Sequence, residues 1–109
     1  MVSYFVRYRG SAADPSAFLA HYRDHHGAIL RCFPQIRSLI LHTPVDVHDP
    51  FPVRPGGSAL LAQMIFEGPG ALDAALHSQA RREARADFAG FRAFAGEITH
   101  EALSGEVIF

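Results

Sequence analysis

The chain has 109 residues, a formal net charge of −1 and a hydrophobic content of 49%, which predicts one domain over residues 1–109 with a single core. Its ten basic residues are scattered along the chain, so no nucleic-acid-binding surface is indicated. The single cysteine excludes an internal disulfide, and there is neither a signal peptide pattern nor an apolar stretch near the roughly 18 residues of a membrane span. We therefore expect a cytoplasmic protein without a nucleic-acid or membrane partner.

The first part of the chain predicts a strand followed by a long helix. Apolar residues alternate over residues 2–9, the period of a strand. Residues 10–13 are expected to form a short loop. Asp14 and Pro15 then supply an N-cap carboxylate and a first-turn proline, which predicts the start of a helix. This helix should run to about Phe33, because the residue before a proline is disfavoured in helical conformation.

Two strands separated by a long loop are predicted next. Residues 36–43 form an apolar run that ends before Pro44, and a nearby proline is typical of an edge strand. Residues 46–57 contain prolines and glycines without any periodicity, which predicts a loop. Residues 58–66 are apolar on both faces and predict a strand in the middle of the sheet.

The last part of the chain predicts a broken helix and a final strand. The Gly-Pro-Gly sequence at residues 68–70 opens a helix that we expect to break near Ser78. Residues 81–94 predict a second helical piece, with a phenylalanine at every third position near its end and Gly96 after it. Residues 98–109 are expected to form the last strand.

The element order βαββαβ predicts an α+β, ferredoxin-like domain, with a four-stranded antiparallel sheet and both helical regions on one face. The strands over residues 2–9 and 58–66 carry apolar side chains on both faces, and helices on one side leave the other face uncovered. A second copy of the chain would supply the missing layer, so we expect a homodimer.

A histidine lies at the centre of the apolar stripe of the first predicted helix. On a helix of 3.6 residues per turn, Tyr22, His26 and Phe33 share the middle of this stripe, while His25 falls at its margin and points in a different direction. Two interpretations of His26 stay open. It is either a core histidine with satisfied ring nitrogens or a group on the wall of a pocket, where an imidazole exchanges protons near neutral pH.

These residues carry a resemblance to the EthD family of dimeric α/β-barrel proteins. In that family an aromatic residue stands four positions before a helical His, and the matching positions here are Tyr22 and His26. Ala28 replaces the usual Pro, and Tyr22 the usual Trp. Weaker similarities to the family are Gly27 after the histidine, Pro34 at the turn into the second strand, and Asp87 followed by Phe88.

The resemblance implies a homodimer whose sheets meet face to face, with a cavity between sheet and helices in each subunit. It does not imply one reaction, because proteins of this fold include isomerases, cyclases, decarboxylases, cofactor-free monooxygenases and haem-degrading proteins.

His21 and His25 have the i,i+4 spacing of a helical metal-ligand pair. A zinc site needs a third protein ligand, and nothing in the sequence selects one from among His42, His48, His77 and His100. We therefore expect no metal site.

His42 lies late in the second strand, and if its side of the strand faces the helices it looks into the same cavity as His26. Four apolar residues are candidate walls for a hydrophobic ligand or, alternatively, ordinary core: Met64, Phe66, Phe88 and Phe91. With Tyr22 and His25, they complete the predicted substrate-binding set.

The sequence thus favours an enzyme without metal or organic cofactor that binds a small hydrophobic, oxygenated or polyketide-like compound. His26 would move a proton next to a carbonyl, in an isomerase, cyclase or decarboxylase type of reaction. The alternative is a non-catalytic dimer that binds a small molecule or haem, with His26, His25 or His42 as ligand or polar anchor.

Overall fold

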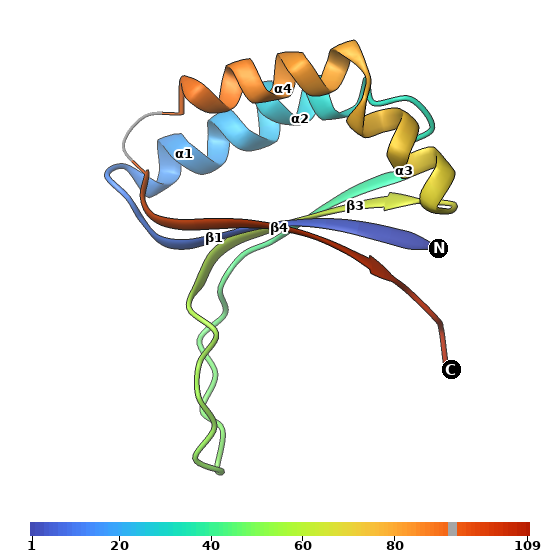
Figure 1. Ribbon diagram of the computed structural model, residues 1–109. Helices are drawn as coiled ribbons and strands as arrows, with labels where there is room; N and C mark the ends of the chain where they lie inside the picture. Colours follow the sequence, from blue (N-terminus) through green and yellow to red (C-terminus); the bar gives the residue numbers. More distant parts are fainter. Residues whose placement is uncertain (92–93) are drawn as a thin grey trace.

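The computed structural model describes residues 1–91 and 94–109, which form a four-stranded antiparallel sheet with all helices on one face (Figure 1). In chain order the elements are β1 (Val2–Ala12), α1 (Pro15–His21), the π-helical turn η1 (Tyr22–His26), α2 (Gly27–Leu30), β2 (Ser38–His42), β3 (Ser58–Phe66), α3 (Pro69–Leu76), α4 (Gln79–Ala89) and β4 (Phe94–Ser104). The predicted α+β ferredoxin-like fold is confirmed. None of the described helices combines the length and apolar character needed to span a membrane.

The strand order β2-β3-β1-β4 places β3 inside the sheet and β2 at an edge, as the sequence predicts. The residues of β3 are those predicted. β1 is longer than predicted, because Gly10 pairs with Gly96 and carries the ladder on to Ala12, where a loop was expected. Both glycines have positive φ, 137° and 146°, and a Cβ atom on either would meet the backbone of the opposite strand. Only glycine permits this approach, which explains why the predicted loop is wrong.

The two faces of the sheet differ because side chains alternate along each strand. Four residues of β3 point toward the helices and are buried, namely Leu60, Ala62, Met64 and Phe66, while Leu61, Gln63 and Ile65 lie on the other face and are half-buried. We call these the covered face and the open face. The main core lies between the covered face and the helices.

The first helical region begins as predicted but does not continue as one α-helix. Asp14 caps it, accepting a hydrogen bond from the backbone N–H of Ala17 at 3.1 Å. At η1 the ladder widens into a π-helical turn, and helical structure ends at Leu30 rather than at Phe33.

The break near Ser78 is confirmed, since the Ser78 side chain caps α4 by accepting from the N–H of Arg81. The predicted helix over residues 81–94 is wrong beyond Ala89, where Gly90 ends α4. Positions 92–93 of that prediction lie outside the described residues. The last strand is displaced from the predicted residues 98–109, because its pairing with β1 starts at Phe94 and its last paired residue is Ser104.

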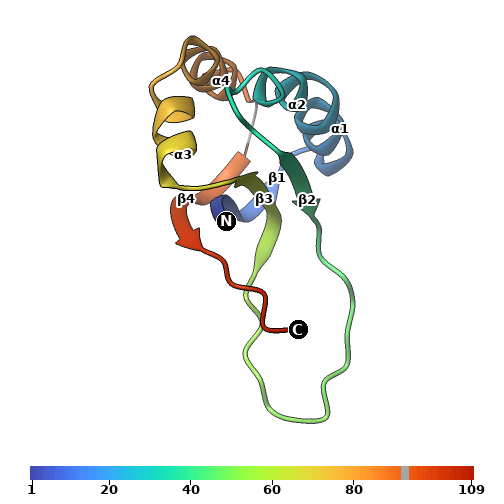
Figure 2. The same cartoon turned by 90° about the vertical axis from the view of Figure 1, so that its right-hand side faces the viewer.

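Residues 43–57, which we call the arm, join β2 to β3 without a helix or strand, as predicted. The arm extends away from the sheet on the side opposite the helices, and the C-terminal residues leave the sheet toward that same side (Figures 1 and 2). Apolar side chains are strongly exposed in both segments: Val45, Val47, Phe51 and Val53 in the arm, and Val107, Ile108 and Phe109 at the C-terminus.

Candidate functional site

His26 of η1 is hydrogen-bonded to Asp87 of α4 beneath the packed helices. The Nδ1–H group of His26 donates to Asp87 Oδ2 at 2.8 Å, and the side chains of His26 and Asp87 are only 7% and 12% exposed. An ionised carboxylate is acceptor-only, so this contact places the ring proton on Nδ1. None of the hydrogen bonds among the described residues involves the other ring nitrogen, Nε2. In the neutral ring Nε2 therefore has a free lone pair.

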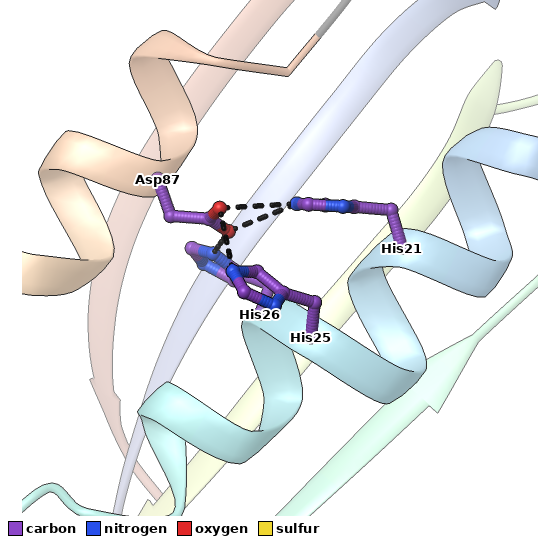
Figure 3. Close-up of polar contacts among 4 residues, drawn as sticks. All are labelled: His21, His25, His26 and Asp87. Carbon is purple, nitrogen blue, oxygen red and sulfur yellow. Dashed lines mark hydrogen bonds and ion pairs between the residues drawn. The ribbon is translucent and has the colours of Figure 1, made fainter.

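Two further imidazoles approach the same carboxylate (Figure 3). Nε2 of His21 lies 3.1 Å from both carboxylate oxygens, and Nε2 of His25 lies 3.3 Å from Oδ1. Asp87 is thus surrounded by three histidines from α1 and η1.

Both His25 and His26 belong to the π-helical turn η1, and both contact Asp87. A regular helix separates adjacent side chains by about 100°, whereas a π-type i→i+5 turn is wider, so successive side chains diverge less. The Gly27 N–H bonds to the carbonyl of Tyr22, five residues earlier, as this turn requires. His26 is buried and His25 is exposed, as expected from their different positions on the helix, but a nitrogen of each ring reaches the same carboxylate, which was not expected.

Asp87 is the site residue that the sequence analysis missed as a functional group, since it entered only as part of the family resemblance. One signal for it exists in the sequence. Ala80 and Ala84 are buried on the inner side of α4, and Asp87 continues their i, i+4, i+7 stripe. An acidic residue within an apolar stripe requires a partner on the element packed against it.

The environment sets the charges of the pair. Burial lowers the pKa of His26, and the hydrogen bond to Asp87 opposes this effect without cancelling it. For Asp87, burial alone would raise the pKa, but hydrogen bonds from His26 and His21 outweigh it and hold the pKa below its ordinary value. At neutral pH His26 is consequently neutral and Asp87 ionised, which are the states of a base and the group that orients it.

His26 lines a cavity of about 30 Å³ between the helices and the covered face. This volume holds about one water molecule. The cavity is lined by Tyr4, Val6, Tyr8, Tyr22, His26, Leu30, Phe33, Met64, Arg81, Ala84, Arg85, Phe88 and His100. None of these described lining residues is acidic, while Arg81 and Arg85 are cationic. The electrostatic environment therefore favours an electron-rich oxygen.

Three of the predicted substrate-binding residues, Tyr22, Met64 and Phe88, line this cavity with His26. Phe91 contacts the His26 ring from the segment after α4, with ring centroids 4.8 Å apart. Phe66 does not line the cavity and is fully buried in the core.

Two predicted residues lie elsewhere. His25 is at the surface beside Asp87, with 64% of its side chain exposed. His42 pairs with Leu61 on the open face and is hydrogen-bonded to Gln63 at 3.0 Å. The face of β2 that carries His42 points away from the helices. The expectation that His42 shares the cavity with His26 is therefore wrong.

Comparison with solved structures places this architecture among known folds. An ethyl tert-butyl ether D (EthD) family protein from Bacillus halodurans superposes with a TM-score of 0.77 and 21% identity, covering 97% of this chain and 99% of that one. The chain shares its fold.

Two other solved structures are also similar. A monooxygenase from Streptomyces coelicolor, solved with the ligand Nanaomycin D, gives a TM-score of 0.70 at 14% identity, covering 99% of this chain and 89% of that one. A dimeric ferredoxin-like protein from Thermobifida fusca gives 0.66 at 10% identity, covering 94% and 89%. No protein-family model and no curated protein matches the sequence. The resemblance to EthD proteins is thus confirmed at the level of the fold.

Proposed function

We propose that this protein is a small-molecule enzyme in which His26 transfers a proton on a hydrophobic, oxygenated or polyketide-like compound. The observation that carries the proposal is the buried His26–Asp87 pair on the wall of a cavity that also presents two arginines. A positioned neutral imidazole with an oriented partner is a general base. The reaction is of the isomerase, cyclase or decarboxylase type.

The proton transfer uses the chain's own groups. Asp87 holds the Nδ1–H of His26, so Nε2 is the atom that accepts a proton from a carbon next to a carbonyl. The C–H electron pair moves into the carbonyl, whose oxygen becomes an enolate beside Arg81 and Arg85. The imidazolium that forms is stabilised by Asp87. Return of the proton to another position completes an isomerisation. In a cyclisation the enolate carbon attacks a second carbonyl, whose oxygen then takes the proton from the His26 imidazolium.

The size of the cavity sets a condition on binding. A volume of about 30 Å³ is far below the roughly 300 Å³ of a pocket for a drug-sized ligand. Arg85 is exposed and Arg81 partly exposed, and both have long side chains. We expect ligand entry to move these two side chains outward, while Tyr22 and Met64 form the fixed apolar floor. The similarity in fold to a monooxygenase with a bound organic ligand agrees with a small-molecule role.

A homodimer is part of this proposal. The open face presents half-buried apolar side chains such as Phe5, Leu61 and Ile65, which helices of the same chain do not cover. The arm adds exposed apolar residues on the same side of the sheet. A second copy placed against the open face would bury both. The dimeric protein of similar fold agrees with this arrangement.

Deuterium exchange tests the reaction without knowledge of the natural substrate. In D₂O, 2-tetralone, a bicyclic ketone with acidic α-protons, should incorporate deuterium faster in the presence of the protein, as followed by proton NMR. His26→Ala should remove at least about 100-fold of this rate, the contribution of a positioned base. His77→Ala, at an exposed histidine that follows the last residue of α3, serves as the matched control.

Retention of the catalysed exchange by His26→Ala would contradict the proposal. Binding of the ketone by the wild-type protein without any acceleration of exchange would also contradict it, and would favour the non-catalytic alternative.

A further inference from the structure

His21, His25 and Asp87 converge at the junction of α1, η1 and α4, with their ligand atoms all within 4.8 Å of one another. We propose that these three side chains bind a divalent transition-metal ion of the Zn²⁺ type, with water completing its coordination. The sequence supplies the His pair but selects no third ligand. The fold supplies one by packing α4 against η1, and this inference goes beyond the proposed function because it does not depend on a substrate.

The distances match those of a metal-ligand set. Ligands at about 2.0–2.1 Å from a tetrahedral Zn²⁺ lie about 3.3 Å from one another. Nε2 of His21 and Nε2 of His25 lie 3.1 Å and 3.3 Å from Asp87 Oδ1. The largest separation in the cluster is at most 4.8 Å, which a small rotation of the two exposed imidazoles would close.

The contact of His25 is poorly explained by hydrogen bonding alone. Its Nε2 lies within ion-pair distance of Asp87 but, unlike the contacts of His21 and His26, does not form a hydrogen bond. A ring nitrogen held near a carboxylate without a bond to it is placed as a ligand atom would be. Two imidazoles and one carboxylate form a donor set suited to Zn²⁺ and its neighbours.

Solvent access and orientation also fit an ion site. The side chains of His21 and His25 are 40% and 64% exposed, whereas Asp87 is only 12% exposed. An ion can therefore enter from the surface and meet a carboxylate fixed from behind. His26 fixes it, since its Nδ1–H bonds to Oδ2, and hydrogen bonds of this kind orient metal ligands in proteins. An ion on Oδ1 would join α1, η1 and α4.

The test is a titration of the full chain with Zn²⁺ in competition with a chromophoric chelator. We expect one ion per chain, with affinity lowered at least about tenfold by His25→Ala and by His21→Ala, as loss of a ligand costs at least what loss of an orienting group does. His77→Ala is the matched control, because His77 also lies beside a carboxylate, that of Asp73 at 3.5 Å, on an exposed helix surface. Affinity unchanged in both ligand variants would overturn the proposal.

Long-range ¹H–¹⁵N spectra of the histidine rings provide a second measurement that is independent of affinity. Zn²⁺ should shift the Nε2 signals of His21 and His25 into the range of metal-bound nitrogen and leave Nδ1 of His26 protonated. Shifts confined to other histidines, or none at saturating Zn²⁺, would overturn the site. Neither measurement uses turnover, so failure of the metal site and failure of the proposed reaction are separately detectable.

Discussion

The covered and open faces of the sheet are built from the same strands, but their side chains lie in different environments. On the covered face, the aromatic rings of Tyr8 and Tyr22 pack edge to face under the helices, and both are 1% exposed. On the open face, apolar side chains alternate with an uncharged network in which Gln63 donates to Ser3 and contacts His42. Helices of the same chain cover the covered face, and they do not cover the open face.

This difference indicates where the fold can hold a buried charged group. Among the described residues, no side-chain nitrogen or oxygen that is itself completely buried lacks a hydrogen-bond partner. Asp87, an ionised carboxylate whose side chain is only 12% exposed, is paired with His26 and His21, because a buried charge is stable only when it is paired. The open face presents apolar and uncharged polar side chains, and the covered face carries the candidate site.

The largest expected effect separates the two faces along one strand. Phe66→Ala on the covered face should lower the free energy of unfolding by about 3–5 kcal/mol, because Phe66 is fully buried and its removal leaves a cavity. Its neighbour Ile65 is half-buried on the open face, so Ile65→Ala should cost about 1 kcal/mol in the monomer. Urea denaturation at low protein concentration measures both, and equal losses would contradict the assignment of faces.

The next effect concerns the open face alone. The wild-type protein should scatter light as a particle of twice the 11.9 kDa of one chain. Ile40→Glu, on the exposed edge strand, should weaken the dimer at least about 100-fold, because burying an unpaired carboxylate in an apolar interface costs several kcal/mol. Ala86→Glu places the same charge on the exposed side of α4 as control. A folded wild-type monomer at micromolar concentration would exclude the dimer.

Much of the fold is predictable because it is specified locally. The strand over residues 58–66 is predicted to the residue, since an apolar run bounded by glycines ends where its pattern ends. The helix start at Asp14 and the break at Ser78 follow from capping groups in the sequence itself.

The incorrect predictions depend on contacts between distant segments. The extension of β1 requires Gly10 to meet Gly96 across the sheet. The site is predictable only in part for the same reason. His26 is identified by its position in an apolar stripe, but its pairing with Asp87 requires the packing of α4 against η1, which helical periodicity does not reveal.

A smaller effect tests the polar pair on the covered face. Asp87→Ala removes the acceptor of the His26 Nδ1–H group, which is then buried without a partner, and should cost about 1–3 kcal/mol of unfolding free energy. Asp73→Ala is the matched control, since Asp73 also pairs with a histidine but on an exposed surface, and it should cost at most about 0.5 kcal/mol. Equal, small losses in both variants in urea denaturation would show that the buried pair does not stabilise the fold.

The smallest effect is a dependence of stability on pH that arises on the covered face. The pKa of His26 is lowered in the folded protein, first by burial, so below the ordinary histidine value of about 6.5 the unfolded chain binds a proton that the native state does not. Stability therefore rises with pH in this window, and it falls as pH decreases from about 6.5 toward the lowered pKa of His26. His100 contributes in the same direction, because burial and the neighbouring Arg81 and Arg85 lower its pKa also. One group produces a slope of at most about 1.4 kcal/mol per pH unit. The lowered pKa of Asp87 acts only at more acidic pH, below its ordinary value of about 3.9, so the pH windows of His26 and Asp87 do not overlap.

Urea denaturation between pH 7.5 and 5.5, with a chelator present, measures the slope of stability against pH. His26→Gln should reduce this slope, because glutamine does not titrate. An unchanged slope in His26→Gln would mean that the pKa of His26 is the same in the folded and the unfolded chain, which would contradict the lowered pKa. A steeper slope in His26→Gln would mean that the native state raises the pKa of His26, and a protonated imidazole has no role as a base.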